Sequence, residues 1–364
     1  MKVVLMHDWL TGFRGGERVL EAFCEMFPQA PLYTLLHKKG STSPSIENRT
    51  IRTSFLDKIP GIHKHYRKFL PLFPKAAESL HIQEKADLVL SSSHCVIKGV
   101  LKPLGSRHLS YIHSPMRYLY DQYEAYFGKD APIYQRMGAA VFKDYLVGWD
   151  RTSNANVDHM VANSHFVKLR IERYYNRFAS VVHPFVELQD FETIQKNPPQ
   201  KEDFYVMVTA FAPNKRVDMA IQLFNCIGKK LKIIGSGQQE KYLKSLAGPN
   251  IQFLGNLKRE EVLSCLSRAK ALIFPGVEDF GITPLEALAA GTPVIAYKIG
   301  GVLETLDDSV AEFFENHTIS DLENAIQRFE TKKFSPAHLH ARAHSFSKQR
   351  FKESMAKQIE DMMG

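Results

Sequence analysis

The chain has 364 residues, of which 44% are hydrophobic and 24% are charged, and its net charge is +8. This composition is typical of a folded globular protein and excludes a largely disordered chain, and the length is sufficient for two domains with separate cores. The sequence contains no apolar run long enough to span a membrane, and residues 1–6 are too short for a signal peptide. Four cysteines without a Cys-x-x-Cys motif favour reduced thiols and a cytoplasmic location.

The positive charge is confined to the first half of the chain. Residues 1–184 hold 25 Lys and Arg against 16 Asp and Glu, a net charge of +9, whereas residues 185–364 hold 22 against 23. A basic half of this kind predicts an anionic partner, such as a lipid phosphate, a membrane surface or nucleic acid. No aromatic RNA-binding signature occurs, which argues against nucleic acid. Residues 59–70 place apolar and basic side chains at helical spacing, which fits either an anionic membrane or the domain's own core.

The first predicted strand covers residues 2–7 and leads into a glycine-containing loop. Asp8 follows the strand directly, and Gly15 and Gly16 precede a segment with helical periodicity over residues 17–26. A strand, a Gly-Gly loop and a helix N-terminus form a candidate anion site, because backbone N–H groups are available there. A tight turn without a ligand is the alternative.

Two further parallel strands are predicted over residues 87–94 and 107–113. The second strand ends at His113, which is followed by Ser-Pro-Met-Arg-Tyr-Leu-Tyr-Asp. Ligands of doubly wound sheets bind beyond the carboxyl ends of the strands, so His113 is a candidate site residue. A purely structural histidine is the alternative. With a further strand over residues 158–164, the first domain is predicted to cover residues 1–186.

A linker is predicted over residues 187–203, where a polar stretch contains a Pro-Pro pair. The second domain is predicted over residues 204–346. Its first strand ends in a loop with adjacent Lys215 and Arg216, which is followed by a helix over residues 217–226. Two cations at a strand-to-helix junction suit a diphosphate, and a solvated basic turn is the alternative.

The next two loops of this domain also follow strands. A strand over residues 231–234 runs into Gly235-Ser-Gly237, a second glycine-containing loop. A turn that contains Leu257 then precedes a helix over residues 261–269.

The segment 274–291, FPGVEDFGITPLEALAAG, has the strongest local signals. An apolar run over residues 271–274 predicts a strand that ends at Pro-Gly. Thr283 is predicted as the N-cap of the next helix, with Pro284 at its first position and Glu286 closing a capping box. Gly291 is predicted to end this helix.

This loop and helix start could hold a phosphate and hydroxyl groups together. The backbone N–H groups near Ile282 and Thr283 and the helix dipole favour an anion. Glu278 and Glu286 frame the loop, and carboxylates beside a phosphate suit sugar or ribose hydroxyls. The structural alternatives are that Glu286 only caps its helix and that Glu278 is a solvated loop acid.

At this point the chain resembles the retaining glycosyltransferases of family four. The resemblance rests on Glu278-Asp-Phe-Gly-Ile-Thr-Pro-Leu-Glu286-Ala, followed by Gly291-Thr-Pro-Val-Ile-Ala and by Gly300-Gly-x-x-Glu. It implies the α/β GT-B fold, with two Rossmann-like doubly wound domains facing each other across a cleft. It also implies that a C-terminal helix over residues 347–362 packs back on the first domain.

The resemblance further implies a retaining hexosyltransferase. His113-x-Pro-Met-Arg and Pro213-x-Lys-Arg-Val-Asp are most similar to bacterial GDP-mannose-dependent mannosyltransferases. We therefore expect an α-mannosyltransferase that uses GDP-mannose and a lipid-linked or polysaccharide acceptor. The sequence has no Asp-x-Asp, so neither a metal nor a further cofactor is expected.

Residue roles follow from the same resemblance. The residues expected to act in catalysis are His113, Lys215, Arg216 and Glu278. Those expected to hold the donor are Gly15, Gly16, Gly235, Gly237, Leu257, Phe280, Gly281, Ile282, Thr283 and Glu286. Those expected on the acceptor side are Asp8, Arg117, Tyr120 and Asp121. The chain departs from the family at Ala210-Phe211, where many members carry an arginine, so Arg216 is expected to take over that phosphate contact.

Two alternative functions remain at the level of sequence. The first is a nucleotide-sugar epimerase of the same fold, and the second is a non-catalytic protein that binds nucleotides or other anions. In each case a cytoplasmic protein is expected, and the basic first domain predicts peripheral contact with the inner face of the membrane.

Overall fold

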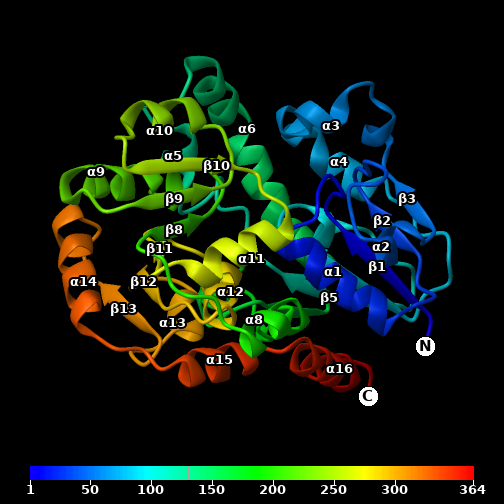
Figure 1. The fold of residues 1–364 in the computed structure, drawn as a ribbon. Helices are drawn as coiled ribbons and strands as arrows, with labels where there is room; N and C mark the ends of the chain where they lie inside the picture. The colour runs from blue at the N-terminus through cyan, green and yellow to red at the C-terminus, as the bar shows by residue number, and fades with distance from the viewer. Residues whose placement is uncertain (130) are drawn as a thin grey trace. The chain divides into compact units, whose positions relative to one another are not determined.

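The computed structural model describes residues 1–129 and 131–364, which divide into two compact units (Figure 1). Unit 1 comprises residues 1–183 and 351–364, and unit 2 comprises residues 184–350. Each unit is an α/β unit built on a parallel sheet, as the alternation of apolar runs and helical segments predicted.

The sheet of unit 1 has the order β3-β2-β1-β4-β5-β6-β7 over the described residues. Its strands are β1 Val3–His7, β2 Leu32–Thr34, β3 Ile51–Thr53, β4 Leu88–Ser93, β5 Arg107–Ile112, β6 His159–Ala162 and β7 Ser180–Val181. All of the pairings are parallel, and Leu5 of β1 pairs with Leu32 on one side and Leu90 on the other. The chain leaves β1 toward one edge and returns through β4, so the topological switch point lies between these two strands.

Helices of unit 1 cover this sheet. They are α1 Gly15–Met26, α2 Pro44–Glu47, α3 Ile62–His65, α4 Phe73–Glu78, α5 Tyr123–Phe127, α6 Ile133–Thr152, α7 His165–Tyr175 and α16 Lys348–Met363. Short 3-10 turns are η1 Phe55–Lys58, η2 Tyr66–Leu72, η3 Ile97–Gly99 and η4 Ser153–Asn156. Ser164 caps α7, because its hydroxyl accepts the N–H of Val167.

The basic segment over residues 59–70 does not form the single helix that its spacing suggested. It is divided between α3 and η2, and its apolar side chains pack against the core of unit 1. These side chains are Ile59, Ile62, Tyr66, Phe69 and Leu70. The apolar residues of this segment therefore serve the core, while its basic residues remain exposed.

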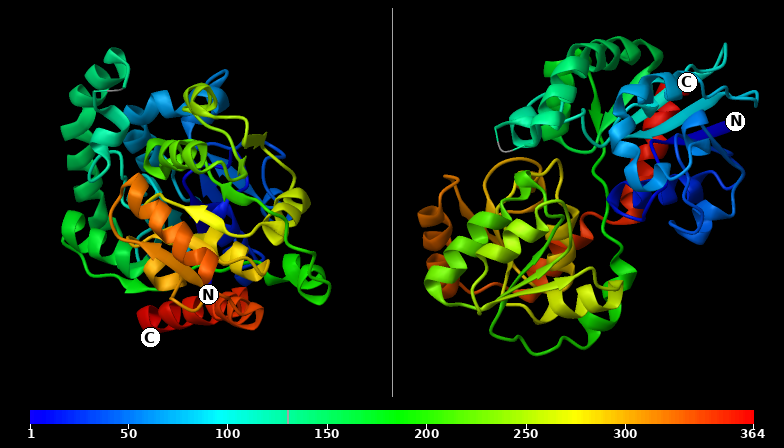
Figure 2. Two further views of the ribbon diagram at one scale, coloured as in Figure 1. Left: turned by 60° about the vertical axis from the view of Figure 1, so that its left-hand side comes forward. Right: turned by 90° about the horizontal axis from the view of Figure 1, so that it is seen from above.

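The C-terminal helix α16 lies on unit 1, where Figure 2 shows it in red among the blue elements. The Phe351 ring packs against the rings of Phe23 and Tyr111, each with 5.7 Å between ring centroids. Further along the helix, the Gln358 side chain hydrogen-bonds with His159 and Ser180. The last helix of the chain thus completes the fold of the first unit.

The sheet of unit 2 has the order β10-β9-β8-β11-β12-β13 over the described residues. Its strands are β8 Tyr205–Val208, β9 Leu231–Ile234, β10 Ile251–Gly255, β11 Leu272–Phe274, β12 Val294–Tyr297 and β13 Ala311–Phe314. These pairings are also parallel, and the switch point lies between β8 and β11.

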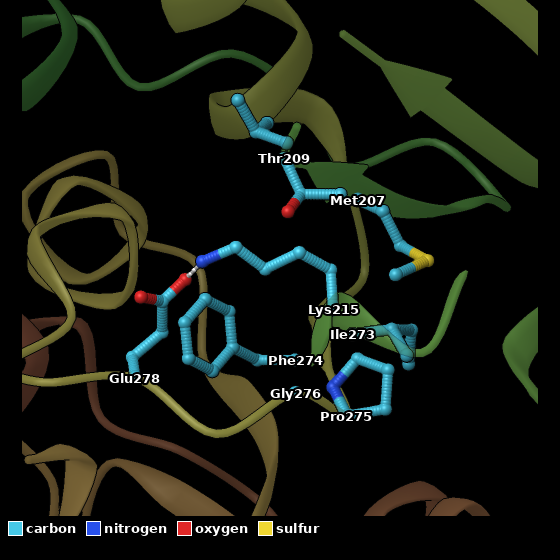
Figure 3. Close-up of a pocket in the computed structure, with 9 residues that line it drawn as sticks. Met207, Thr209, Lys215, Ile273, Phe274, Pro275, Gly276 and Glu278 are labelled. Carbon is cyan, nitrogen blue, oxygen red and sulfur yellow. Dashed lines mark ion pairs between the residues drawn. The ribbon is translucent and has the colours of Figure 1, made fainter. Parts of the chain in front are cut away.

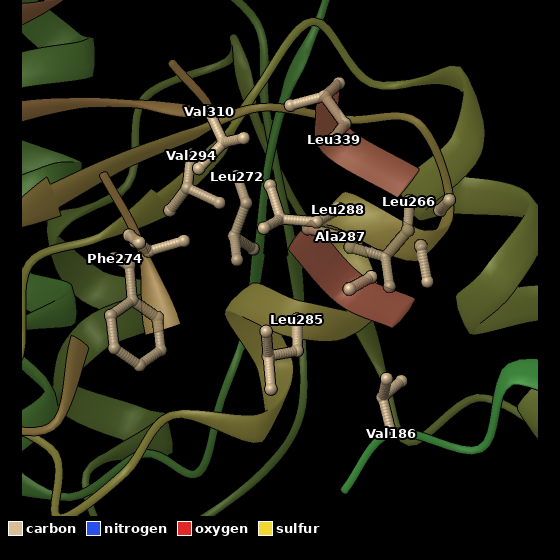
Figure 4. Packing of buried hydrophobic residues seen from close by; sticks show 14 of the residues in the cluster. Val186, Leu266, Leu272, Phe274, Leu285, Ala287, Leu288, Val294, Val310 and Leu339 are labelled. Atoms are coloured by element: carbon tan, nitrogen blue, oxygen red, sulfur yellow. The ribbon is translucent and has the colours of Figure 1, made fainter. Parts of the chain in front are cut away.

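Helices pack on both faces of the second sheet. They are α8 Glu192–Lys196, α9 Val217–Ile227, α10 Glu240–Leu246, α11 Arg259–Arg268, α12 Ile282–Ala289, α13 Val302–Thr305, α14 Ile319–Thr331 and α15 Pro336–His344. One core cluster joins α12 to the sheet, with Leu285 and Leu288 buried near Leu272 and Val294, and Leu339 of α15 joins them (Figure 4). Burying a leucine side chain contributes about 1.5–3 kcal/mol, so this cluster fixes α12 on the sheet.

The segment over residues 187–203 is not a plain linker. It contains the 3-10 turn η5 Leu188–Phe191 and helix α8, and it belongs to unit 2. The Phe191 side chain is fully buried in the core cluster of that unit, and Leu188 and Ile194 pack against the same cluster. The composition of this segment predicted a linker because most of its residues are polar, so the few apolar residues that reach the core were not recognised.

Candidate active site

The switch point of unit 2 places two predicted motifs beside each other. The loop after β8 and the loop after β11 both leave the carboxyl edge of the sheet, where ligands of such sheets bind. A pocket at this edge is lined by Met207, Val208, Thr209, Lys215, Ile273, Phe274, Pro275, Gly276 and Glu278 (Figure 3).

Lys215 and Glu278 form an ion pair across this pocket, as Figure 3 shows. Their side chains are 15% and 20% exposed, so the pair stays in contact with water and its contribution to stability is in the range of surface pairs. Gly276 permits this contact, because a Cβ there would lie 2.6 Å from the carbonyl oxygen of Asn214. The two residues were predicted from separate motifs, and the fold brings them together.

The backbone of Glu278 is held by the predicted Gly-Gly motif. The N–H of Gly301 donates to the carbonyl oxygen of Glu278 at 2.9 Å. Gly300 has a φ of +90°, and a Cβ there would lie 2.5 Å from the same oxygen. This close approach explains why glycine is required beside the loop.

Arg216 has other partners than its neighbour Lys215. It has a φ of +49°, and its Nε donates to Asp218 Oδ1 at 3.2 Å. Its Nη1 lies 3.4 Å from Nδ1 of His317, whose Nε2 donates to the carbonyl oxygen of Pro275 at 2.8 Å. Burial lowers the pKa of His317, which keeps its ring neutral in this position. Of the two adjacent basic residues, Lys215 is therefore the one that lines the pocket. The phosphate contact expected of Arg216 stays a prediction.

The start of α12 differs from the predicted capping box. The helix begins at Ile282, and its N-cap is Gly281 in the left-handed region with a φ of +96°. Thr283 is therefore the second helical residue, and Glu286 is too far along the helix to reach the N-cap. The prediction was wrong because a glycine can adopt the left-handed conformation that starts the helix earlier. The N–H groups of Ile282 and Thr283 still lie in the first turn, where an anion is favoured.

Glu286 forms an ion pair with an arginine that the sequence did not indicate. Arg259, the first residue of α11, donates from Nη1 to Glu286 Oε1 at 2.6 Å and from Nε to Asp190 Oδ2 at 3.0 Å. Burial alone would lower the pKa of Arg259, but the two carboxylates outweigh it and raise the pKa. The Glu286 carboxylate is thus held in place with hydrogen-bonding capacity left for a ligand.

The other residues expected to hold the donor have mainly structural contacts. A Cβ at Gly235 would collide with the carbonyl oxygen of Thr209, and one at Gly237 would lie 2.6 Å from that of Phe211. These glycines therefore let the loop after β9 approach the loop after β8. The side chains of Phe280 and Leu257 pack in or against the core of unit 2, and the Phe280 ring contacts Phe346 with 5.7 Å between centroids. Their donor contacts stay predictions.

The switch point of unit 1 brings the predicted histidine and the Gly-Gly motif together. A hydrogen-bonded chain runs from His7 Nδ1 to Ser92 Oγ at 3.1 Å and from Ser92 Oγ to His113 Nε2 at 2.8 Å. Gly15 and Gly16 begin α1, and a Cβ at Gly16 would lie 3.8 Å from His113 Nε2. Residues from β1, α1 and β4, and the residue that follows β5, thus meet at one edge of the sheet.

Burial controls the charge of His113. It lowers the pKa of His113 well below its ordinary value, and the nearby His94 and His7 lower it further. His113 is therefore neutral at physiological pH and can both donate and accept a hydrogen bond. Glu17 Oε1 lies 3.8 Å from His7 Nε2; burial raises the pKa of Glu17, but its interactions with His7 outweigh this and lower it.

Asp8, expected on the acceptor side, is fully buried and holds a loop. Its Oδ2 accepts the N–H groups of His94 and Cys95 at 2.7 and 2.9 Å, and its Oδ1 accepts those of Val96 and Ile97 at 2.8 and 2.9 Å. Four charge-assisted bonds to backbone amides fix the turn after β4. This role is structural, and the acceptor contact expected of Asp8 stays a prediction.

The remaining acceptor-side residues lie in the segment after His113. Asp121 pairs with Arg170 at 2.7 Å, and Tyr120 donates to Asp150 Oδ2 at 2.7 Å. No sequence pattern indicated Arg170, which is buried on α7. The side chain of Arg117 is half-buried in the same segment. Acceptor contacts of these residues stay predictions.

Two Rossmann-like units, each with polar residues gathered at its switch point, define the GT-B class of proteins. Solved structures of glycosyltransferases have this fold. Sucrose-phosphate synthase from Thermosynechococcus elongatus is 17% identical and matches with a TM-score of 0.76 over 100% of this chain and 99% of that chain. The HepE protein of Anabaena in complex with UDP-glucose is 13% identical, with a TM-score of 0.69 over 99% and 100% of the two chains.

Residues 189–349 match the family model of the glycosyl transferases group 1. The α-1,3/1,6-mannosyltransferase ALG2 of Dictyostelium discoideum is 26% identical over 47% of this chain and 52% of its own length. The O-antigen chain mannosyltransferase RfbU of Salmonella typhimurium is 29% identical over 47% of this chain and 53% of its own length. A GDP-mannose-dependent monoacylated α-(1-6)-phosphatidylinositol monomannoside mannosyltransferase of Corynebacterium glutamicum is 35% identical over 26% and 27%. The chain thus spans about half the length of the first two relatives.

Proposed function

We propose that this protein is a retaining glycosyltransferase that moves mannose from GDP-mannose to a lipid-linked or polysaccharide acceptor and forms an α-linkage. The observation that carries the proposal is the pair of Lys215 and Glu278 at the switch point of unit 2. A cation and a carboxylate at one ligand-binding edge match the two parts of a sugar-nucleotide, its diphosphate and its hydroxyl groups.

Lys215 would stabilise the leaving diphosphate. Its ammonium group has three N–H donors, so it can hold the Glu278 carboxylate and a phosphate oxygen at the same time. The first N–H groups of α12, at Ile282 and Thr283, and the positive end of the helix dipole add to this field. Such groups accelerate the reaction because the negative charge on the diphosphate grows as the bond to the sugar breaks.

The carboxylates and His113 would orient the hydroxyl groups. Glu278 keeps acceptor positions for the transferred sugar beside its bond to Lys215, and Glu286, fixed by Arg259, would accept from the ribose. Neutral His113 would hydrogen-bond to the sugar. In a front-face displacement, the acceptor oxygen bonds to the anomeric carbon while the bond between that carbon and the diphosphate oxygen breaks. The proton of the acceptor hydroxyl passes to the departing diphosphate. The configuration at the sugar is then retained.

The choice of donor rests on the relatives. Three are named as mannosyltransferases, and one of them as GDP-mannose-dependent. One structure of the same fold contains UDP-glucose, which makes that molecule the appropriate competitor in a test.

A ligand screen followed by a transfer assay tests the proposal. GDP and GDP-mannose should raise the melting temperature more than UDP, UDP-glucose or ADP, because a ligand stabilises in proportion to its occupancy. Labelled mannose should then pass to a lipid extract or an oligosaccharide, and NMR of the product should show the α-anomer. A preference for UDP or ADP would exclude GDP-mannose as the donor. Conversion of the donor to an epimer without any acceptor would establish the epimerase alternative instead.

A further inference from the structure

Helix α6 of unit 1 presents an apolar stripe to solvent that the proposed chemistry does not use. Met137 and Val141 are 65% and 72% exposed, although both are apolar. The exposed apolar and aromatic side chains of this helix are Ile133, Tyr134, Met137, Val141, Phe142 and Tyr145. Tyr134, Met137, Val141 and Tyr145 recur at intervals of three or four residues, so they lie along one side of the helix.

The second half of α6 attaches the helix to unit 1. Leu146 is buried in the core cluster of that unit, and Asp150 pairs with Lys98 at 2.6 Å. The indole N–H of Trp149 donates to Glu78 of α4 at 2.7 Å. Figures 1 and 2 show α6 as one long helix whose first turns extend away from the sheet of unit 1. The stripe is thus a fixed feature of a well-anchored helix.

The charge around the stripe favours an anionic surface. Lys and Arg exceed Asp and Glu by nine over residues 1–183 and fall short by one over residues 351–364, so unit 1 holds the whole net charge of +8. On α6 itself, the stripe is flanked by the exposed Arg136 and Asp144 and by the half-buried Lys143. Further exposed basic residues lie on the segment that leads into α4, namely Lys64, Arg67 and Lys68.

We infer that the apolar stripe of α6 inserts into the surface of an anionic lipid bilayer, with the basic side chains of unit 1 contacting the lipid phosphates. Among the described residues, none of the helices combines the length and the apolar character that crossing a bilayer requires, so α6 would lie in the interface. Aliphatic residues with tyrosines beside basic groups are the composition of such interfacial helices. A second copy of the chain is a poorer occupant, because a symmetric contact would bring two units of charge +8 together.

Docking to a bilayer extends the proposed function, and the inference rests on that function for one point only, namely that the acceptor is carried by a lipid. Docking of unit 1 would then bring the enzyme to a bilayer in which such an acceptor is dissolved. Binding to the bilayer itself needs neither donor nor acceptor, so it can be measured separately from the reaction.

Sedimentation with vesicles tests the inference on the full chain. Wild-type protein should sediment with vesicles of phosphatidylcholine mixed with phosphatidylglycerol and much less with phosphatidylcholine alone, and added salt should weaken the binding. The double variant M137S/V141S should lose at least about tenfold in vesicle affinity, because two exposed apolar side chains no longer enter the bilayer. The triple variant K64Q/R67Q/K68Q should lose at least about tenfold as well.

A matched control lies in the loop between η3 and β5 of the same unit. Leu101 and Leu104 are also exposed and precede β5, so L101S/L104S removes two aliphatic side chains without touching α6. This control should bind vesicles as the wild type does. All three variants should keep the wild-type melting temperature and its increase with GDP, which separates this test from that of the proposed function.

Three outcomes would overturn the inference. The first is absence of vesicle binding by the wild type, and the second is an equal loss in M137S/V141S and in the leucine control. The third is a dimer, seen by sedimentation velocity, that M137S/V141S dissociates while vesicle binding stays unchanged. That result would assign the stripe to contact with a second copy.

Discussion

Replacement of Lys215 with alanine separates the stability of the pocket from its ability to bind a diphosphate. The ion pair of Lys215 with Glu278 is partly exposed, and such pairs contribute about 0–1 kcal/mol to folding. The melting temperature of Lys215→Ala should therefore change little. A charge-assisted contact to phosphate contributes roughly 1.5–3 kcal/mol, so the Kd for GDP should rise by a factor of about 10 to 150.

Calorimetric titration of GDP into both proteins measures this difference. Lys241→Ala is the matched control, because Lys241 is an exposed lysine on α10 of the same unit. This control should bind GDP as the wild type does. Wild-type GDP affinity in a folded Lys215→Ala variant would refute the reasoning, since Lys215 would then serve only as the partner of Glu278.

Three further predictions follow from individual contacts. Glu286→Gln should weaken donor binding in a titration and should also lower the melting temperature, because Arg259 loses a charged partner at 2.6 Å; a fully silent variant would contradict both roles. Asp8→Asn should lower the free energy of unfolding in urea by roughly 2–3 kcal/mol, because one amide oxygen cannot accept the four N–H groups that the carboxylate holds, and a neutral result would remove its structural role. Burial lowers the pKa of His108 to about 4, so as the pH falls below about 6.5 this histidine takes up a proton in the unfolded chain before it does so in the folded protein. The free energy of unfolding should therefore decrease by about 2 kcal/mol between pH 7 and pH 5, and His108→Gln should make this decrease smaller.

The sequence predicted the parts of the site whose positions depend on strand ends. Apolar runs marked the strands, and in a parallel sheet the carboxyl ends of neighbouring strands meet at one edge. Lys215 and Glu278 came from loops after β8 and β11, which are adjacent in the sheet. Gly16 and His113 came together for the same reason in unit 1. Local patterns were sufficient here because the sheet supplies the long-range geometry.

The sequence did not predict side-chain partners between distant segments. Arg259 reaches Glu286 across 27 residues of chain, and nothing in either local pattern specifies that pair. The prediction of a capping box was wrong because the N-cap of the helix is Gly281, which adopts the left-handed conformation, whereas the sequence pattern pointed to Thr283. Asp8 was expected on the acceptor side, and its role in the turn after β4 was not predicted, because the four amides that it binds lie far along the chain.

The two switch points differ in charge, and this difference assigns them different parts of the proposed reaction. The edge of unit 2 has a lysine and a helix N-terminus, both of which favour the negative charge of a diphosphate. The edge of unit 1 has His113, which burial keeps neutral, beside a glycine that leaves space above it. A neutral imidazole offers little to a phosphate but exchanges hydrogen bonds well with hydroxyl groups. His113→Ala should consequently lower turnover while it leaves the affinity for GDP unchanged, because GDP has the phosphates of the donor but not its sugar. A large loss of GDP affinity in that variant would show that the division between the two units is wrong.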